Sequence, residues 1–359
     1  MGIFSFKRKD KSESEKGPKG FFSVRVEEVK KLTDDSVQIV FDLPSDLKSK
    51  FQFVPGQYIN IAVDINGKSE RRSYSICSSK DESLSIAVKA VKDGKVSNWV
   101  NDVLRPGDHL WISSPEGNFK LDNQQMNIVC IAAGSGITPI LSMIKTMDTK
   151  NGTSRLLFGN RYSNNIMFQD EIQSLNSVNT TLFLSGEDKN GFRRGRINKD
   201  NLTEVIKEDL DLLKADAFFI CGPEGMIKEA KNTLTFFGVP ENKVKYELFT
   251  VSENSGDGKV LENDFSGMSH IKVILDDEIA EFDLDAKGKT ILTAVEASGL
   301  DAPYSCRGGV CCSCKAKVLQ GNAVMKMNYS LTEEEIAEGY ILTCQAHPAS
   351  EKVVISFDE

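Results

Sequence analysis

The sequence CRGGVCCSC occupies residues 306–314, and one further cysteine, Cys344, follows 29 residues after it. Cys306, Cys311 and Cys314 therefore have the spacing C-x4-C-x2-C. Together with Cys344 they match the thiolate ligand pattern of a [2Fe–2S] cluster. A loop can deliver three thiolates to a small cluster and a distant strand the fourth, so we expect this site to organise the C-terminal part of the chain.

The residues between these cysteines favour a cluster over the alternative, a zinc site with four cysteine ligands. Gly308 and Gly309 allow the backbone to approach closely and to point N–H groups at the sulfurs. Zinc sites usually combine two C-x-x-C pairs, whereas this segment has one. Cys312 lies between two ligands, but its spacing excludes it from the pattern. We therefore expect Cys312 to be only a small loop side chain near the cluster.

Composition narrows the class of protein. The chain has 359 residues, enough for two or three domains, and 40% hydrophobic with 27% charged residues is ordinary for a globular protein. A net charge of −8 disfavours nucleic-acid binding, which usually needs a basic face. No apolar run approaches the ~18 residues of a membrane span, so we expect no membrane association. Eight cysteines without a secretory signal predict a cytoplasmic location, where clustered cysteines bind metal.

Periodicity divides the N-terminal part of the chain into a tail and a β domain. Residues 1–20 are rich in Lys, Glu, Ser and Gly, which predicts a disordered tail. Residues 21–122 read as short strands separated by turn signals, which is typical of a small antiparallel β-barrel. The predicted strands are 22–29, 37–41, 58–63, 73–76, 84–91 and 109–113.

The hydrophobic pattern differs in residues 123–250, where apolar strands alternate with helical stretches. This is the βαβ pattern of an open parallel sheet. The predicted strands are 128–132, 156–158, 182–184 and 217–220, with a helix over 224–237 closed by Gly238.

The remainder is predicted to be a linker and a third domain. Residues 251–269 are polar and rich in Gly and Ser, which is typical of a linker. Residues 270–359 are expected to form an α+β domain. A hairpin over 271–284 and a helix from about Thr290 to Gly299 precede the cysteine loop.

A basic and aromatic tetrad, RSYS at residues 72–75, lies on a predicted strand of the first domain. Arg72 can hold a diphosphate through two parallel hydrogen bonds. Tyr74 can stack on a flavin, and the Ser75 hydroxyl can reach flavin N5, where a hydride arrives. The tetrad alone is a weak signal, because a basic and aromatic strand is usually only a strand.

A glycine turn strengthens the flavin interpretation. The segment GKVS at residues 94–97 precedes a helix predicted over 98–104. A glycine turn that leads into a helix N-terminus is a natural seat for a pyrophosphate.

A second glycine-rich segment, AGSGITP at residues 133–139, follows a predicted strand. Thr138 is expected to be the N-cap and Pro139 the first residue of the next helix. The glycines bring backbone amides close to a phosphate, although the G-x-G-x-x-G fingerprint is absent and an ordinary βα turn is the alternative. Another strand ends in the turn Cys221-Gly222-Pro223.

In order and spacing, these motifs resemble the ferredoxin–NADP reductase superfamily, followed by a plant-type ferredoxin domain with a β-grasp fold. The resemblance covers residues 21–359. In that superfamily the R-x-Y-S strand binds the flavin and the G-x-x-S turn binds the pyrophosphate, which implies FAD rather than FMN. Residues 327–331 (MNYSL) and 339–345 (GYILTCQ) are most similar to reductase components of oxygenases.

The resemblance implies a set of site residues. The flavin contacts are Arg72, Ser73, Tyr74, Ser75, Val88, Val96 and Ser97. The nicotinamide nucleotide contacts are Gly134, Gly136, Thr138, Arg161, Arg196, Cys221, Gly222, Pro223 and Phe249. Ser75 and Cys221 are implied to lie beside the hydride path, and Cys306, Cys311, Cys314 and Cys344 to bind the cluster.

Arginines bear on the choice between NADPH and NADH, because a 2′-phosphate needs them. Arg161 and Arg196 match positions where NADPH-using relatives carry arginine. Many such relatives also have Ser-Arg-Glu where this chain has SGE at residues 185–187. Arg193 or Arg194 is expected to replace the missing arginine, and NADPH is expected over NADH.

The resemblance implies an electron-transfer enzyme. NAD(P)H gives two electrons as a hydride to FAD, and single electrons then pass through the cluster to an external oxygenase. Another acceptor is an alternative, either a Rieske or di-iron hydroxylase or the hybrid-cluster protein. A non-enzymatic redox sensor is a further alternative, against which the intact motifs argue. Cys77 and Cys130 are expected to be plain core residues.

Overall fold

The computed structural model describes residues 17–249 and 264–359. Most of the predicted tail and of the predicted linker therefore lies outside the described residues. The chain forms two compact units. The first runs to Tyr246, apart from residues 116–118, and contains the two six-stranded sheets, while the second contains the remaining sheets.

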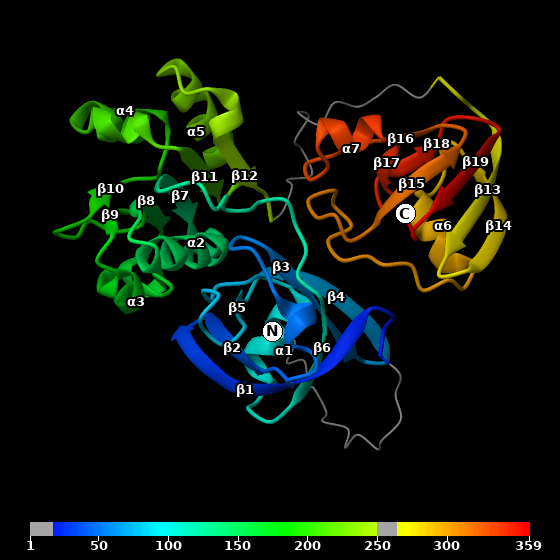
Figure 1. Ribbon diagram of the computed structural model, residues 1–359, viewed down its shortest axis with the longest axis horizontal. Helices are drawn as coiled ribbons and strands as arrows, with labels where there is room; N and C mark the ends of the chain where they lie inside the picture. Colours follow the sequence, from blue (N-terminus) through cyan, green and yellow to red (C-terminus); the bar gives the residue numbers. More distant parts are fainter. Residues whose placement is uncertain (1–16, 250–263) are drawn as a thin grey trace. The chain divides into compact units, whose positions relative to one another are not determined.

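The first sheet is the predicted antiparallel barrel (Figure 1). Its strands are β1 (Phe21–Thr33), β2 (Ser36–Asp42), β3 (Tyr58–Ile65), β4 (Lys68–Ser75), β5 (Ser85–Lys89) and β6 (His109–Ser113), in the order β4-β3-β6-β1-β2-β5. An antiparallel bridge between Ile76 and Ile86 connects the two ends of this order. Helix α1 (Lys95–Asp102) and the short 3-10 turn η1 (Lys48–Phe51) complete the barrel domain.

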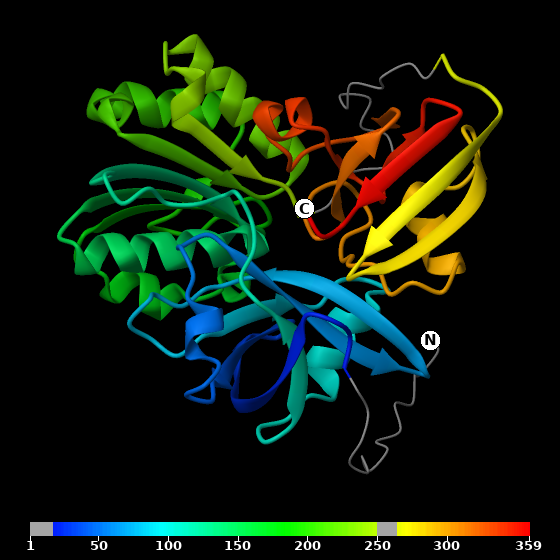
Figure 2. The same cartoon turned by 45° about the vertical axis from the view of Figure 1, so that its right-hand side comes forward.

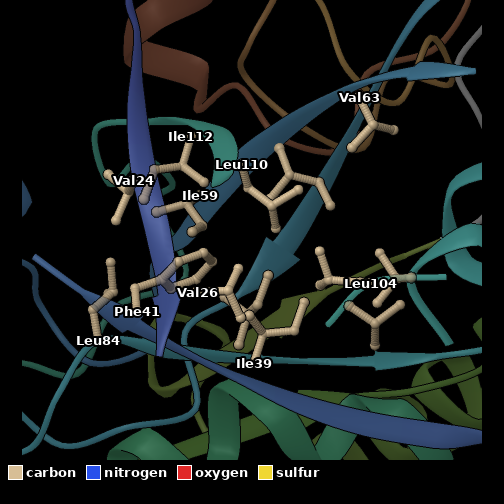
Figure 3. Close-up of a cluster of buried hydrophobic side chains, with 14 of the residues drawn as sticks. Val24, Val26, Ile39, Phe41, Ile59, Val63, Leu84, Leu104, Leu110 and Ile112 are labelled. Carbon is tan, nitrogen blue, oxygen red and sulfur yellow. The ribbon is translucent and has the colours of Figure 1, made fainter. Parts of the chain in front are cut away.

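Alternation of apolar residues explains why these segments form a barrel. In β2, Val37, Ile39 and Phe41 are buried on one face, which is the two-residue period of a strand. They meet Val24 and Val26 of β1 in a cluster of aliphatic and aromatic side chains (Figure 3). Full burial of each such side chain contributes about 1.5–3 kcal/mol, so this core holds the barrel rigid around the predicted flavin strand.

The second sheet has the order β10-β9-β8-β7-β11-β12, and its pairs from β10 to β11 are parallel, as predicted. Its strands are β7 (Asn127–Ala133), β8 (Thr153–Asn160), β9 (Val178–Leu184), β10 (Arg193–Arg194), β11 (Ala217–Cys221) and β12 (Val244–Glu247). Its helices are α2 (Ile137–Thr149), α3 (Gln169–Ser174), α4 (Lys199–Glu208) and α5 (Glu224–Phe236), and its 3-10 turns are η2 (Gly134–Gly136), η3 (Ser163–Asn165), η4 (Leu210–Lys214) and η5 (Glu241–Lys243).

The order of this sheet locates its binding edge. Helices α2 and α3 cover one face of the sheet and α4 and α5 the other (Figures 1 and 2). From β7 the chain first adds β8 and β9 on one side and later β11 on the other, so strand order reverses at β7. In open parallel sheets, ligands bind beyond the carboxyl ends of the strands at this reversal point. The segments after β7 and β11 are the two predicted nicotinamide motifs.

The second unit has the predicted α+β organisation. Its main sheet has the order β14-β13-β19-β15-β17, and β16 pairs with β18. The strands are β13 (Met268–Leu275), β14 (Glu278–Asp285), β15 (Lys315–Gln320), β16 (Ala323–Met325), β17 (Tyr340–Leu342), β18 (Ala346–Pro348) and β19 (Lys352–Ser356), and the helices are α6 (Ile291–Ala297) and α7 (Glu333–Ala337). Buried residues of α6 and of the sheet share one core. Thr290 caps α6 and Gly299 follows it with φ 93°, as the sequence indicated.

Several boundaries differ from the predictions. Helix α1 begins at Lys95 rather than at residue 98, because Gly94 is its N-cap. Strand β13 begins at Met268, inside the predicted linker. Cys77 follows β4 rather than lying within a strand, yet Cys77 and Cys130 are both fully buried, which confirms them as core residues. None of the described helices is long and apolar enough to cross a membrane.

Candidate functional site

The four predicted ligand cysteines come together in the second unit. Cys311, Cys314 and Cys344 are buried and Cys306 is half-buried. The Sγ atoms of Cys306 and Cys311 lie 3.0 Å apart, and the Cys344 thiol is hydrogen-bonded to those of Cys306 and Cys314. Cys312 points elsewhere, since its Sγ lies 3.5 Å from the carbonyl oxygen of Ser330. The loop therefore supplies three thiols, the turn between β17 and β18 rather than a strand supplies the fourth, and Cys312, which the spacing excludes, is left out.

Backbone conformation and one amide hold this loop in shape. Arg307 has φ 54° and Gly309 has φ 72°, and a Cβ on Gly309 would lie 3.1 Å from the Met327 carbonyl oxygen. The Gln345 side-chain amide donates to the Arg307 carbonyl oxygen at 2.9 Å. The Gly308 N–H lies 3.3 Å from Cys306 Sγ, as its predicted role requires.

The electrostatics of the four thiols fit a cluster. Hydrogen bonds from the Cys311 and Cys344 thiols lower the pKa of Cys306 well below its usual value, against the effect of burial. The same contacts raise the pKa of Cys344, because four crowded thiols cannot all ionise without cations among them. Iron ions supply that positive charge when a cluster binds, and thiolates are the ligands that they take. The four side chains therefore fit a [2Fe–2S] cluster in both chemistry and placement.

The predicted flavin strand is β4, which pairs with β3 in register Ile59↔Tyr74 and Asn60↔Ser73. The Ser73 hydroxyl donates to the Asn60 side-chain oxygen at 2.8 Å. Tyr74 packs against the barrel core, and burial raises the pKa of its phenol, so the hydroxyl stays neutral. Ser75 ends the strand and is buried. The tetrad is thus held on a rigid strand.

The second flavin motif lies beside this strand. Glu70 pairs with Arg72 at 3.5 Å and with Lys95 in the first turn of α1. Val96 and Ser97 are buried in the same turn. A Cβ on Gly94 would lie 2.4 Å from Ser97 Oγ, so the turn needs glycine there. The first turn of α1 and the Arg72 guanidinium therefore meet at Glu70, whose carboxylate pairs with both cations, and their contact with a diphosphate stays a prediction.

Val88, the remaining predicted flavin contact, is fully buried in β5. Its carbonyl oxygen accepts from the Asn101 side chain of α1 at 3.3 Å. Val88 therefore contacts α1 through its backbone carbonyl oxygen, while the Val88 side chain belongs to the barrel core.

The predicted nicotinamide turn follows β7, but its capping was predicted wrongly. Gly136 is the N-cap of α2, and Thr138 and Pro139 lie inside the first helical turn. The reason is that Gly134–Gly136 form a 3-10 turn that leads directly into the helix. The Thr138 hydroxyl donates to the Ser135 carbonyl oxygen at 3.0 Å, and Pro139 occupies a position that needs no N–H.

This turn packs against the predicted C-G-P turn. A Cβ on Gly136 would lie 2.2 Å from the carbonyl oxygen of Cys221, and one on Gly222 would lie 3.2 Å from the Ala133 Cβ. Cys221 is fully buried at the end of β11, and Pro223 is the N-cap of α5. The two motifs, about 85 residues apart in sequence, thus form one surface at the reversal point of the sheet.

The predicted arginines divide into two groups. Arg161 and Arg196 are exposed, and the Arg161 guanidinium lies 5.2 Å from the centre of the Tyr162 ring. Arg193 pairs with Glu204 and Glu208 of α4, so its charge is already engaged, and Arg194 lies 3.8 Å from Asp188. Both arginines therefore have carboxylate partners, and the replacement of the missing arginine by either one stays a prediction.

Phe249 is half-buried and is the last described residue before position 250. It belongs to the second unit, whereas the flavin strand belongs to the first. Its predicted contact with the flavin or nicotinamide stays a prediction.

Two site residues escaped the sequence reasoning. Glu70 lies two positions before Arg72, so the two-residue period of a strand places both side chains on one face and could have revealed the pair. Gln345 follows a ligand cysteine, but no pattern indicates that its amide reaches back to Arg307.

Comparison with protein families matches each part of the chain. Residues 23–121 match the description "Oxidoreductase FAD-binding domain", residues 130–232 "Oxidoreductase NAD-binding domain" and residues 273–349 "2Fe-2S iron-sulfur cluster binding domain". The chain therefore has FAD-binding, NAD-binding and 2Fe–2S domains in the predicted order.

Whole-length relatives share this order. The chain is 35% identical to a component of 1,2-phenylacetyl-CoA epoxidase from Escherichia coli K12, over 94% of this chain and 98% of the relative. It is 31% identical to the ferredoxin reductase component of 3-ketosteroid-9-alpha-monooxygenase from Rhodococcus rhodochrous, over 90% and 93%. Among solved structures, phthalate dioxygenase reductase has the same fold, with a TM-score of 0.60, 23% identity and coverage of 94% and 98%.

Proposed function

Since the chain belongs to the ferredoxin–NADP reductase superfamily, as a reductase component of an oxygenase system with its own [2Fe–2S] domain, we propose that its acceptor is the oxygenase of a phenylacetyl-CoA epoxidase. One observation carries this choice of acceptor. Identity to the epoxidase component is 35%, higher than the 31% to the ketosteroid reductase component, and the match covers 98% of that epoxidase component.

Each part of the chain has a separate task in this proposal. When bound, FAD takes a hydride from the nicotinamide nucleotide and the iron–sulfur cluster carries single electrons onward. Arg72 and the first turn of α1 hold the diphosphate, while Tyr74 gives the flavin a rigid wall. Ser75, at the end of β4, would direct its hydroxyl toward the flavin ring.

The nicotinamide nucleotide is held at the edge of the parallel sheet. The backbone N–H groups at Gly134 and Gly136 face its phosphates at the start of α2, where the helix dipole favours negative charge. Thr138 and Cys221 shape the nicotinamide pocket, with Gly222 and Pro223 completing its wall. Buried Cys221 contributes shape rather than a nucleophile.

NADPH is the proposed electron donor. Arg161 and Arg196 lie exposed after β8 and β10, where a 2′-phosphate can reach them. The nearby Glu187 carboxylate accepts from the Ser163 N–H, which lowers the pKa of Glu187 and keeps the carboxylate engaged. The exposed positive charge at this edge therefore supports NADPH over NADH.

We place the protein in the cytoplasm. All eight cysteines are free thiols, including four that must be reduced to bind iron. Thiols persist where glutathione and thioredoxin keep them reduced.

Reconstitution with purified acceptors tests the proposal. The protein, NADPH and the phenylacetyl-CoA epoxidase oxygenase should convert phenylacetyl-CoA with NADPH oxidation coupled to product. A Rieske oxygenase, a di-iron hydroxylase and the hybrid-cluster protein serve as competing acceptors. Faster coupled turnover with any of these would reject the epoxidase as partner. NADPH-dependent cytochrome c reduction separately distinguishes a working reductase from a redox sensor, which would show no turnover.

A further inference from the structure

A lysine outside every predicted motif is buried between the barrel and the parallel sheet of the first unit. Lys145 lies in α2, and its side chain is only 7% exposed. Its ammonium donates to both carboxylate oxygens of Glu82, at 2.9 and 3.0 Å, and also pairs with Glu171. Glu82 belongs to the loop after β4 in the barrel, and Glu171 belongs to α3, so one cation joins three elements.

A second buried contact connects the same helix and loop. Ser142 lies one helical turn before Lys145, and its hydroxyl donates to the Ser78 carbonyl oxygen at 2.7 Å. Residues three apart lie on one face of a helix, so both side chains reach the loop from the same side of α2. The serine and the lysine therefore fasten α2 to the loop at two points.

The loop that receives these contacts is itself closely braced. The Cys77 N–H donates to the Ser85 carbonyl oxygen, and the Ser85 N–H donates to Ser78 Oγ at 3.1 Å. The Ser79 N–H donates to a Glu82 carboxylate oxygen at 2.7 Å. A displacement of Glu82 would therefore move the whole segment between β4 and β5.

The partner on α3 is presented by a strained backbone. Phe168, the N-cap of α3, has φ 60° and ψ 26°, a left-handed conformation that is costly for a bulky residue. Its side chain is buried, and α3 begins at the next residue and carries Glu171 in its first turn. Strain of this kind persists where the surroundings determine the conformation, and it frequently marks a functional constraint.

Stability alone does not account for this arrangement. Lys145 is buried although its two partners are partly exposed, and desolvation of a buried charge offsets much of its attraction to its partners. Burial by itself would lower the pKa of Lys145, but the hydrogen bonds to Glu171 and Glu82 hold that pKa above its usual value. The lysine therefore stays charged and keeps both partners, which fixes geometry more than it adds free energy.

Lys145 lies a short distance along the chain from both cofactor motifs. Thr138 lies seven residues earlier in the same helix, about 10 Å away at 1.5 Å per residue. Ser78 lies three residues after Ser75, at most about 10 Å along an extended chain. The contacts thus join the flavin strand to the nicotinamide turn by a short, stiff path.

We propose that Lys145, with Glu82 and Ser142, is a positioning device that sets the distance between the flavin strand and the nicotinamide turn for hydride transfer. The inference rests on the proposed placement of the two cofactors at those motifs. Reacting atoms must come within about 3–3.5 Å, and a displacement of 1 Å can cost about 100-fold in rate. A clamp between the two binding elements therefore acts on the rate of hydride transfer.

The test compares two variants with matched controls in the full-length holoprotein. Lys145→Met removes the charge and keeps the length of the side chain, and Lys150→Met makes the same change at the C-cap of the same helix. Glu82→Ala removes the loop partner, and Asp81→Ala is its neighbouring control. Glu82 is 44% exposed, so Glu82→Ala disturbs the core less than Lys145→Met and serves as the second variant.

Two readouts are combined. Stopped-flow absorbance under anaerobic conditions gives the rate of FAD reduction at saturating NADPH and the Kd of NADPH. Amide hydrogen exchange gives the protection of residues 76–86 without turnover. We expect FAD reduction to slow by about 10–100-fold in Lys145→Met and Glu82→Ala, with faster exchange of residues 76–86 and an unchanged Kd. Both controls should match the unaltered protein.

Each other outcome overturns the clamp. A normal rate with faster exchange shows that the loop does not set the hydride distance. A slow rate of FAD reduction with unchanged hydrogen exchange would show that Lys145 does not hold the loop. A slow rate that a raised Kd for NADPH explains would show that Lys145 acts on NADPH binding rather than on hydride transfer. A separate variant tests the proposed cofactor placement. If FAD does not bind at the β4 motif, Arg72→Ala would retain FAD, while the hydrogen exchange of residues 76–86 in the Lys145 and Glu82 variants would still be faster.

Discussion

Replacement of Gly136 by alanine tests the nicotinamide surface most sharply. The new Cβ would lie 2.2 Å from the carbonyl oxygen and 2.5 Å from the carbonyl carbon of Cys221. Such contacts are not found below 3.0 Å, so the turn and the strand must separate by at least 0.8 Å, the difference between 3.0 and 2.2. Both atoms belong to the main chain, so no side chain can rotate away.

This displacement moves the start of α2 relative to Cys221. A shift of about 1 Å at a hydride donor costs about 100-fold in rate, and the forced contact destabilises the fold by about 1–3 kcal/mol. Stopped-flow reduction of FAD by NADPH should therefore be about 100-fold slower in Gly136→Ala. FAD content and the visible absorbance of the cluster should not change, because their sites lie elsewhere.

Gly225→Ala is the matched control. Among the described residues, a Cβ at Gly225 meets nothing within 4 Å, and Gly225 lies in helix α5, where alanine is favoured by up to about 1 kcal/mol. It should leave FAD reduction unchanged and raise the free energy of unfolding slightly. Normal FAD reduction in a folded Gly136→Ala protein would refute the assignment of this turn to the nicotinamide nucleotide.

Three further predictions concern the cluster, the dinucleotide and the core. Cys344→Ser should lose cluster absorbance and cytochrome c reduction but keep FAD reduction by NADPH, whereas Cys312→Ser should keep all three; a Cys344→Ser protein with a normal cluster would reject the ligand set. Arg161→Ala should raise KM for NADPH by about 10–100-fold and leave KM for NADH unchanged, because a charge-assisted hydrogen bond contributes about 1.5–3 kcal/mol, and equal effects on both would argue against a 2′-phosphate contact. Burial raises the pKa of Cys77 to about 12 and also raises that of Cys130, so the folded state keeps protons that the unfolded state loses above about pH 8.5. The free energy of unfolding should therefore fall from about pH 8.5 towards 12, and denaturant titrations of a Cys77→Ala, Cys130→Ala variant should show a shallower fall.

Sequence reasoning predicted the architecture well because periodicity and turn residues act locally. The alternation in β2 and the short apolar strands of the parallel sheet were enough to separate a barrel from an α/β domain. Cysteine spacing was equally informative, since the ligands of a compact cluster must follow a fixed order along the chain.

Helix starts were less predictable. Threonine is a favoured N-cap residue, yet the glycines before Thr138 already form a 3-10 turn. The Thr138 hydroxyl donates a hydrogen bond to the Ser135 carbonyl oxygen instead. At α1, Gly94 is the N-cap, and the Ser97 hydroxyl oxygen accepts from the Val91 N–H in the preceding loop. In both places contacts outside the helix decided the boundary.

Long-range polar contacts were beyond prediction from one sequence. Lys145 lies in an apolar helix 63 residues from Glu82, and nothing local distinguishes it from a solvated lysine. The amide of Gln345 reaches Arg307 across 38 residues. Such pairs depend on how the elements fold back on each other, which periodicity does not encode.

In the proposed function, one chain carries electrons from NADPH through FAD to a [2Fe–2S] cluster. Anaerobic titration of the purified protein with NADPH, followed by visible absorbance and electron paramagnetic resonance, tests it most directly. A hydride brings two electrons, FAD holds two and the cluster one, so we expect an endpoint of about 1.5 equivalents of NADPH per chain, with the signal of a reduced [2Fe–2S] cluster. Bleaching of FAD that stops at about one equivalent, with the cluster still oxidised, would contradict it.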